Sequence, residues 1–197
     1  MSLDLNSNEF NSGVAIFNQG NAGACTNVTL SVEKKADPAT KRPDWKLIAT
    51  DAAGASTDLA FYYLDEANQY YENSVKRRGK ILKHLLQVVV GPDLKIPVFA
   101  NNVEMLDKCM ELIAMKITGK KFAAFANYGT TNKPDAYIKL RNFVPIISNI
   151  ADADSLMPTP IDLMVRPQPD GGTAAESKDD LFGEAPAAGT IAEENWL

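Results

Sequence analysis

The spacing of apolar residues changes twice along the chain, and these changes constrain the fold more than any other feature of the sequence. Over residues 24–33 apolar and polar residues alternate, which is typical of a half-buried strand. Segments 45–50 and 57–64 predict two more strands, joined by short connections as in an antiparallel meander. Over residues 67–89 the apolar residues recur every three or four positions instead, which predicts an amphipathic helix with Asp65 as its N-cap.

A second helix and two further strands complete the predicted order of elements. Asn101, with Glu104 at the capping-box position, predicts a helix that ends at Gly119. Segments 120–128 and 137–147 predict the last two strands. Three strands, a helical insert and two strands are the order of the OB barrel. The predicted fold class is therefore mainly β with an α insert, a five-stranded OB-like barrel with one or two helices between strands three and four.

The formal net charge of −5 is unevenly distributed along the 197 residues. Through Ile150 the chain has 18 basic and 15 acidic residues, a net charge of +3, whereas the last 47 residues have two basic and ten acidic ones, a net charge of −8. From Gln168 onward no apolar periodicity remains, so this segment cannot bury enough surface to offset the entropy lost on ordering. We therefore predict a compact, mildly basic OB-like body over residues 1–150 and a disordered, acidic tail containing Pro, Gly and Ala over residues 151–197.

Several classes of protein are excluded by composition. No run of 18 uncharged apolar residues occurs, so we expect no membrane span and no membrane partner. The start, Met1-Ser2-Leu3-Asp4, lacks the basic and apolar regions of a secretory signal, which favours a cytoplasmic protein. Cys25 and Cys109 lie far apart and form no CxxC pair, which argues against a disulfide scaffold and a thiolate zinc site.

Residues that could carry catalysis are sparse. The one histidine, His84, falls on the polar face of the first predicted helix, where we expect it to be exposed. No HExxH, GxSxG or glycine-rich phosphate loop is present, and the carboxylates of the body are scattered singly. We therefore predict a protein that is not an enzyme and needs no cofactor or metal, with a small enzyme that uses His84 as a rival reading.

The last predicted strand combines rings and cations on its outer face. Alternation places four side chains on one side of this strand: Tyr137, Lys139, Arg141 and Phe143. Rings on which bases stack, next to cations that follow the phosphates, are typical of surfaces that bind single-stranded nucleic acid. In the alternative reading the two rings pack under the helices and the two cations are merely solvated.

Further basic and aromatic residues gather near the two loops with which OB folds bind oligonucleotides. They are, around the first loop, Lys34, Lys35, Lys41, Arg42, Trp45 and Lys46, and, around the second, Lys120, Lys121, Tyr128 and Lys133. A candidate second basic face lies on the first helix and consists of Lys76, Arg77, Lys80 and Lys83. This face could contact phosphates, hold the acidic tail or simply be solvated.

The acidic tail contains two short apolar elements flanked by carboxylates. One is Asp179-Asp180-Leu181-Phe182, and the other is formed by Glu193, Glu194, Trp196 and Leu197 at the end of the chain. An aromatic residue in an acidic segment is typical of a docking peptide, whose ring fills a pocket while its carboxylates meet basic residues. The alternative is a solubilising tail with an incidental tryptophan.

Four segments resemble those of replicative single-stranded DNA-binding proteins, phage-encoded members above all. They are Gly13-Val-Ala-Ile-Phe-Asn18, Pro43-Asp-Trp-Lys-Leu47, Phe61-Tyr-Tyr63 and Leu140-Arg-Asn-Phe-Val144. The chain also resembles this family in its basic body and in its acidic tail with an aromatic residue near the end. It departs from the bacterial pattern, in which the tail is rich in Asp and ends in Pro-Phe, because the chain ends in Glu-Glu-Asn-Trp-Leu.

The resemblance implies binding of single-stranded DNA without sequence specificity during replication, recombination or repair, in the host cytoplasm for a phage protein. It also implies that the tail competes with DNA and recruits a polymerase, helicase or nuclease, through either of its two apolar elements. A homodimer, cooperative assembly and a preference for RNA all stay open. The alternative function is that of a phage structural or adaptor protein whose β-barrel binds another protein.

Overall fold

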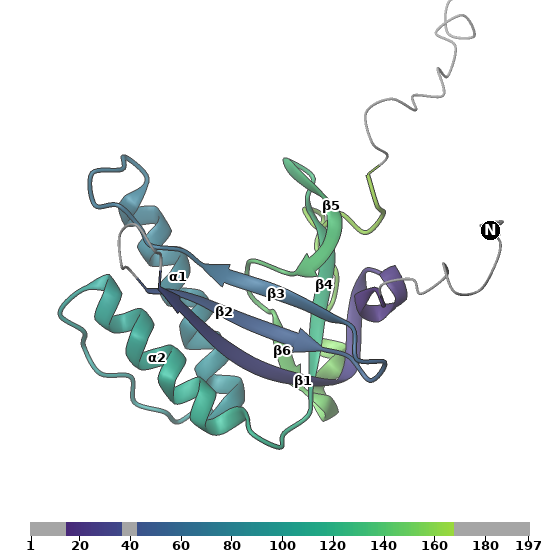
Figure 1. Cartoon of the computed structure of the whole chain (residues 1–197), viewed down its shortest axis with the longest axis horizontal. Coiled ribbons are helices and arrows are strands. Elements are labelled where there is room, and N and C mark those ends of the chain that lie inside the picture. Colours follow the sequence, from purple (N-terminus) through teal and green to yellow (C-terminus); the bar gives the residue numbers. More distant parts are fainter. Residues whose placement is uncertain (1–14, 37–42, 168–197) are drawn as a thin grey trace, which may run out of the picture. The chain divides into compact units, whose positions relative to one another are not determined.

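The computed structural model describes residues 15–36 and 43–167, and all structural statements below concern these residues. They form one mainly β unit in which two helices are inserted between the third and fourth strands (Figure 1). The strands are β1 (Gly23–Ala36), β2 (Pro43–Thr50), β3 (Ser56–Phe61), β4 (Phe122–Thr130), β5 (Lys133–Leu140) and β6 (Ile147–Asn149). The helices are α1 (Tyr71–Val89) and α2 (Asn102–Ile117), with short 3-10 turns η1 (Phe17–Gly20) and η2 (Ile150–Ser155).

All strand pairs are antiparallel, in the order β3-β2-β1-β4-β5, with β6 also paired to β4. The long strand β1 joins the two halves of this sheet, because residues 29–36 pair with β2 whereas residues 23–28 pair with β4. The register shifts between Cys25 and Val28, where Asn27 has a positive φ of 59°. Such an irregularity bends a strand, and β1 accordingly curves from β2 toward β4 (Figure 1). The predicted meander of the first three strands is thus confirmed.

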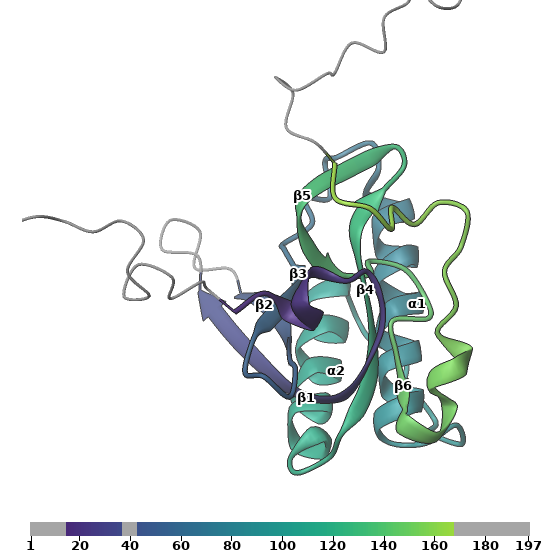
Figure 2. The same ribbon diagram turned by 90° about the vertical axis from the view of Figure 1, so that its right-hand side faces the viewer.

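The two helices lie side by side and cover one side of the sheet (Figures 1 and 2). Their apolar stripes meet Val28, Leu47 and Phe122 of the strands in one core. The second helix begins as predicted, because the Asn101 side chain accepts a hydrogen bond from the Glu104 amide at 2.9 Å. These contacts place the polar outer faces of β2 and β3 away from the helices.

The first helix begins later than predicted. Asp65 is not its N-cap. The Asp65 carboxylate instead accepts a hydrogen bond from the backbone amide of Ala67, in the segment before the helix. The Asn68 side chain forms a similar turn with the amide of Tyr70, and α1 starts only at Tyr71. Asp and Asn side chains often compete with helix formation through such local bonds.

The predicted last strand, 137–147, is wrong as a single element. The first part belongs to β5, which ends at Leu140, and the chain then turns and returns to β4 as the short strand β6. Pro145 lies in this turn and has no amide hydrogen to donate to a ladder, which is consistent with a break in the strand.

The predicted boundary after Ile150 also lies too early, because the compact unit extends to Pro167. Leu156 is buried against Ala123 and Phe125, and Leu163 exchanges backbone hydrogen bonds with β4 through the Tyr128 amide and the Gly129 carbonyl. Counted to Pro167, the chain has 19 basic and 18 acidic residues, a net charge of +1. Residues 168–197 have seven acidic and one basic residue, a net charge of −6, and lie outside the described residues.

Candidate nucleic-acid interface

Two hollows follow one another along β3, on the side of the sheet where β5 approaches it. The hydroxyl of Thr57 in β3 donates a hydrogen bond of 3.0 Å to the carbonyl of Ile138 in β5. The first hollow has a volume of about 410 Å³ and is lined by side chains from β2, β3 and β5, among them Lys46, Ile48, Asp58, Tyr137 and Lys139. The second has about 270 Å³ and is lined by residues of β3, α1 and the segment after β5, among them Tyr62, Arg77, Arg78 and Asn142. The two hollows share no lining residue, and we use the name β3–β5 groove for the pair of them.

One exposed ring stands at each hollow. Tyr137 is 71% exposed and Tyr62 is 63% exposed, so both rings present a face to solvent. The prediction had included Tyr137 but not Tyr62, although the alternation of β3 could have indicated it: Thr57, Leu59 and Phe61 face inward, so the next residue faces outward. Each of these exposed rings can stack on a base.

The lysines of the first hollow are already paired with carboxylates. Lys46 Nζ lies 2.6 Å from Asp58 Oδ2, and this hydrogen bond raises the pKa of Lys46. Lys139 Nζ lies 2.5 Å from Asp135 Oδ2. Burial favours a higher pKa for Asp135, but the bonds from Lys139 and from the Tyr137 amide outweigh it, so this pKa is lowered. A phosphate that enters this hollow must therefore compete with carboxylates for both lysines.

The second hollow has cations whose partners are mainly uncharged. Arg77 donates from Nε and Nη2 to the backbone carbonyl of Asn142, at 3.2 and 2.9 Å. Arg78 is buried and donates to the carbonyl of Tyr62 and, at 3.1 Å, to the side chain of Asn102. Burial lowers the pKa of Arg78 to about 10, which leaves it charged at neutral pH. Arg77 had been assigned to a second basic face, and the structure places it in the groove instead.

The prediction that Arg141 belongs to the outer face is wrong. Its side chain is fully buried, with Nη2 2.6 Å from Asp162 Oδ2 and Nε 3.1 Å from Asp162 Oδ1. The guanidinium lies over the ring of Phe125 at 3.5 Å and near that of Phe143 at 5.1 Å. The prediction of an exposed Arg141 assumed that strand alternation continues past Leu140, but β5 ends there. For the same reason Phe143 is not aligned with Tyr137 and lies half-buried beside Arg141.

Two rings predicted to stack on bases are buried in the body. Trp45 is 5% exposed, donates from Nε1 to Asp107 Oδ1 at 2.6 Å and has Lys34 Nζ 4.7 Å from its ring centroid. Tyr128 is 7% exposed and donates from its hydroxyl to the carbonyl of Gly20 at 2.7 Å. The alternation of Trp45 with Leu47 and Ala49 was the signal that this ring faces inward.

The other predicted cations are distributed over the body. Lys34 lies 3.4 Å from Asp107, Lys35 lies 3.4 Å from Glu33, and Lys120 donates to the carbonyl of Val89. Lys121 and Lys133 are exposed. The remaining predicted residues lie outside the described residues: Lys41, Arg42, Asp179, Asp180, Leu181, Phe182, Glu193, Glu194, Trp196 and Leu197.

The four residues of the candidate second basic face are all exposed on α1. Lys76 lies 3.8 Å from Glu72 on the same helix, and Arg77 belongs to the β3–β5 groove. Lys80 and Lys83 are exposed on α1.

The expectation that His84 is an exposed surface residue is wrong. Its Nε2 accepts hydrogen bonds from the backbone amides of Ile146 at 3.1 Å and Ile147 at 3.4 Å, which ties α1 to β6. Burial lowers the pKa of His84, consistent with a neutral ring that accepts at Nε2. The structure thus assigns this histidine a packing role.

Within residues 15–36 and 43–167, no three His, Cys, Asp or Glu side chains gather where they could hold a metal ion. No helix of this part is long and apolar enough to cross a membrane. Compared with protein-family models the chain has no match, and compared with curated proteins it also has none.

Proposed function

We propose that this chain binds single-stranded DNA without sequence specificity, through an OB-like barrel whose binding surface is the β3–β5 groove. The order β3-β2-β1-β4-β5, with β5 beside β3 at Thr57 and Ile138, supports the barrel. The observation that carries the function is the pair of exposed rings, Tyr62 and Tyr137, each beside cations at one of two hollows along β3. This is the combination that stacks on bases and follows phosphates.

In this proposal the rings supply most of the affinity and the cations supply less. Each stacked base contributes about 1–3 kcal/mol, whatever its sequence. Three cations of the groove, Lys46, Arg77 and Lys139, would give a slope of log K against log salt of about −2. Because two of them must exchange a carboxylate for a phosphate, we expect a shallower slope than this.

A titration with labelled oligo-dT and with duplex of equal length, at two salt concentrations, tests the function. We expect oligo-dT to bind more tightly than duplex, with a weak salt dependence. Tyr137→Ala should lower the affinity for oligo-dT by roughly 1–3 kcal/mol, because one stacked base is lost. The matched control is Tyr70→Ala, since the Tyr70 ring is 63% exposed but lies outside both hollows. No oligo-dT binding at low salt, or equal effects of the two substitutions, would contradict the proposal.

The proposal also covers protein partners, which the acidic residues 168–197 would bind. By its resemblance to phage single-stranded DNA-binding proteins, the chain would act in the cytoplasm of a bacterial host during replication, recombination or repair. Asp179-Asp180-Leu181-Phe182 or the element that ends in Trp196-Leu197 would then recruit a polymerase, helicase or nuclease.

One observation favours a second candidate, a phage structural or adaptor protein whose barrel binds another protein. Asp58 and Asp135 neutralise the lysines of the first hollow, which suits a partner surface of mixed charge. Such a protein would bind neither oligo-dT nor duplex at low salt, and the titration above separates the two functions.

A further inference from the structure

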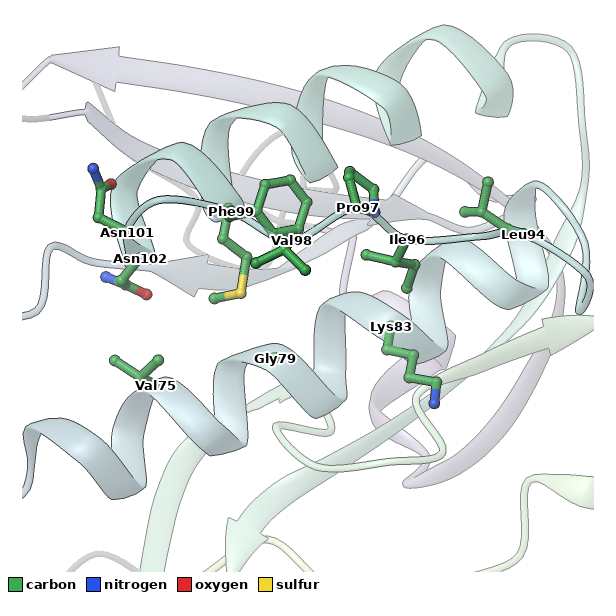
Figure 3. Close-up of a pocket in the computed structure, with 11 residues that line it drawn as sticks. Val75, Gly79, Lys83, Leu94, Ile96, Pro97, Val98, Phe99, Asn101 and Asn102 are labelled. Carbon is green, nitrogen blue, oxygen red and sulfur yellow. The ribbon is translucent and has the colours of Figure 1, made fainter.

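An apolar groove of about 660 Å³ lies between α1 and the segment of residues 91–101 that connects the two helices. Val75, Gly79 and Lys83 of α1 form one side of it, and Ile96, Val98 and Phe99 form the other (Figure 3). Its volume falls within the range of about 300–1,000 Å³ that is usual for ligand sites. It lies apart from the β3–β5 groove, with which it shares no lining residue.

The helix side of this groove is hollow because of Gly79. Residues 75, 79 and 83 lie four positions apart and therefore form one stripe along α1. A Cβ at position 79 would meet only the sulfur of Met105, at 4.0 Å, so the space above it is open. Glycine weakens a helix interior, yet α1 continues through this position without a break.

The connecting segment presents apolar side chains that the core covers only in part. Leu94, Ile96 and Phe99 are half-buried and pack against the core. Val98, between Ile96 and Phe99 along the chain, is fully exposed at the groove.

The charge at the groove is positive. Lys83 is the charged residue among those that line it, and it is exposed. Lys80 is the next cation on the same helix, and residues 76–90 contain no acidic residue. The groove thus suits a ligand with large apolar side chains and carboxylates next to them.

The end of this chain has that chemistry. Residues 168–197 have a net charge of −6, and the last ten residues contain Ile191, Trp196 and Leu197 around Glu193 and Glu194. We propose that the groove binds the C-terminal segment of a second copy of this chain, with the apolar side chains in the groove and the carboxylates near Lys80 and Lys83. Because the groove and the segment are different parts of the chain, this contact is head-to-tail and can link copies in series.

The test measures binding of a fluorescein-labelled peptide of residues 188–197 to the full chain by anisotropy, without DNA. We expect saturable binding of the peptide. Gly79→Leu should weaken this binding at least about tenfold, because the leucine side chain fills the groove and blocks an anchor site. Gly79→Ala is the matched control and should leave binding unchanged. Trp196→Ala in the peptide should weaken binding as strongly as Gly79→Leu does.

Two further measurements test the role of the charge of Lys83 and the separation of the groove from the DNA-binding surface. Lys83→Glu should weaken binding of the peptide, whereas Lys116→Glu, on the exposed side of α2, should not. Excess oligo-dT should not displace the peptide, and peptide binding should persist even if the chain binds no DNA. Absence of binding, equal binding by Gly79→Leu and Gly79→Ala, or displacement by oligo-dT would each overturn the proposal.

Sedimentation of the full chain identifies the occupant as a second copy. We expect concentration-dependent association that Trp196→Ala and Gly79→Leu both abolish. A chain that stays monomeric at every concentration while the free peptide binds would show that the groove does not bind a second copy.

Discussion

At the residue scale, the least expected feature is a buried ion pair that connects the last described segment to the rest of the body. Arg141 and Asp162 have no exposed side-chain surface, and Asp162 also accepts from the amide and hydroxyl of Thr159. The Arg141 guanidinium further donates to the carbonyls of Pro145 and Met157. One cation therefore joins the turn after β5 to the segment after η2.

We expect Asp162→Ala to destabilise the fold by about 3–5 kcal/mol, because it leaves a buried guanidinium without its counter-charge. Urea unfolding followed by circular dichroism measures this change. Asp154→Ala, at an exposed aspartate, is the control and should change stability by less than about 0.5 kcal/mol. A small effect of Asp162→Ala would show that the pair contributes little to the fold.

His84 predicts a pH dependence of stability. Its folded-state pKa lies below 6.5 because of burial, so the unfolded state binds more protons between the folded pKa and about 6.5. This contribution to stability is thus complete above about pH 6.5 and declines as the pH falls toward the folded pKa. Urea unfolding between pH 7.5 and 5.5 should show the decline, and His84→Gln, which keeps an acceptor but does not titrate, should remove it. An identical decline in His84→Gln would assign it to another group.

At the element scale, the two helices differ in how much of their length is buried against the strands. The stripe of α2 is buried almost to its end, whereas α1 buries Ile81, Leu82, Leu85 and Leu86 but opens around Gly79. The N-terminal part of α1 therefore has surface on two sides, with Arg77 toward the β3–β5 groove and Gly79 toward the apolar groove. One helix thus lines both the second hollow of the β3–β5 groove and the apolar groove.

Gly79→Ala should stabilise the chain by about 0.5–1 kcal/mol, because alanine favours a helix and its Cβ meets only an ordinary contact with Met105. Thermal unfolding measures the gain. Gly129→Ala provides the contrast, since Gly129 has a φ of 86° and an added Cβ would lie 2.4 Å from the carbonyl oxygen of Lys133. A loss of stability in Gly79→Ala would mean that the helix is strained at this position.

At the scale of the whole molecule, charge is less segregated than the split at Ile150 implies. Residues through Pro167 are nearly neutral, at +1, and the excess of acid lies in residues 168–197, at −6. The body therefore does not attract DNA through its net charge, and any binding must come from the local arrangement of rings and cations in the β3–β5 groove.

Deleting residues 168–197 should raise the affinity for oligo-dT, because it removes six net negative charges from the chain. The gain should be larger at low salt, since the screening length is about 30 Å at 0.01 M and about 10 Å at 0.1 M. Titrations at both concentrations measure it. A full-length variant with the seven acidic residues of this segment replaced by amides is the control, and it should reproduce the gain if charge is the cause. An unchanged affinity in both variants would contradict an inhibitory role of the acidic segment.

Local spacing was sufficient to predict the meander, both helices and the cap at Asn101, because each depends on residues a few positions apart. The same alternation assigned Tyr137 correctly to an exposed face. These parts of the fold were determined by the sequence alone.

Only the tertiary structure decided which cations and rings are available. Asp107 reaches Trp45 across 62 positions, Asp162 reaches Arg141 across 21, and Ile138 meets Thr57 across 81. Such pairs form when strands and connections come together in space, and no short-range period encodes them. For this reason Arg141 was predicted on the surface, and the arrangement of Tyr62, Arg77 and Tyr137 emerged only from the approach of β5 to β3.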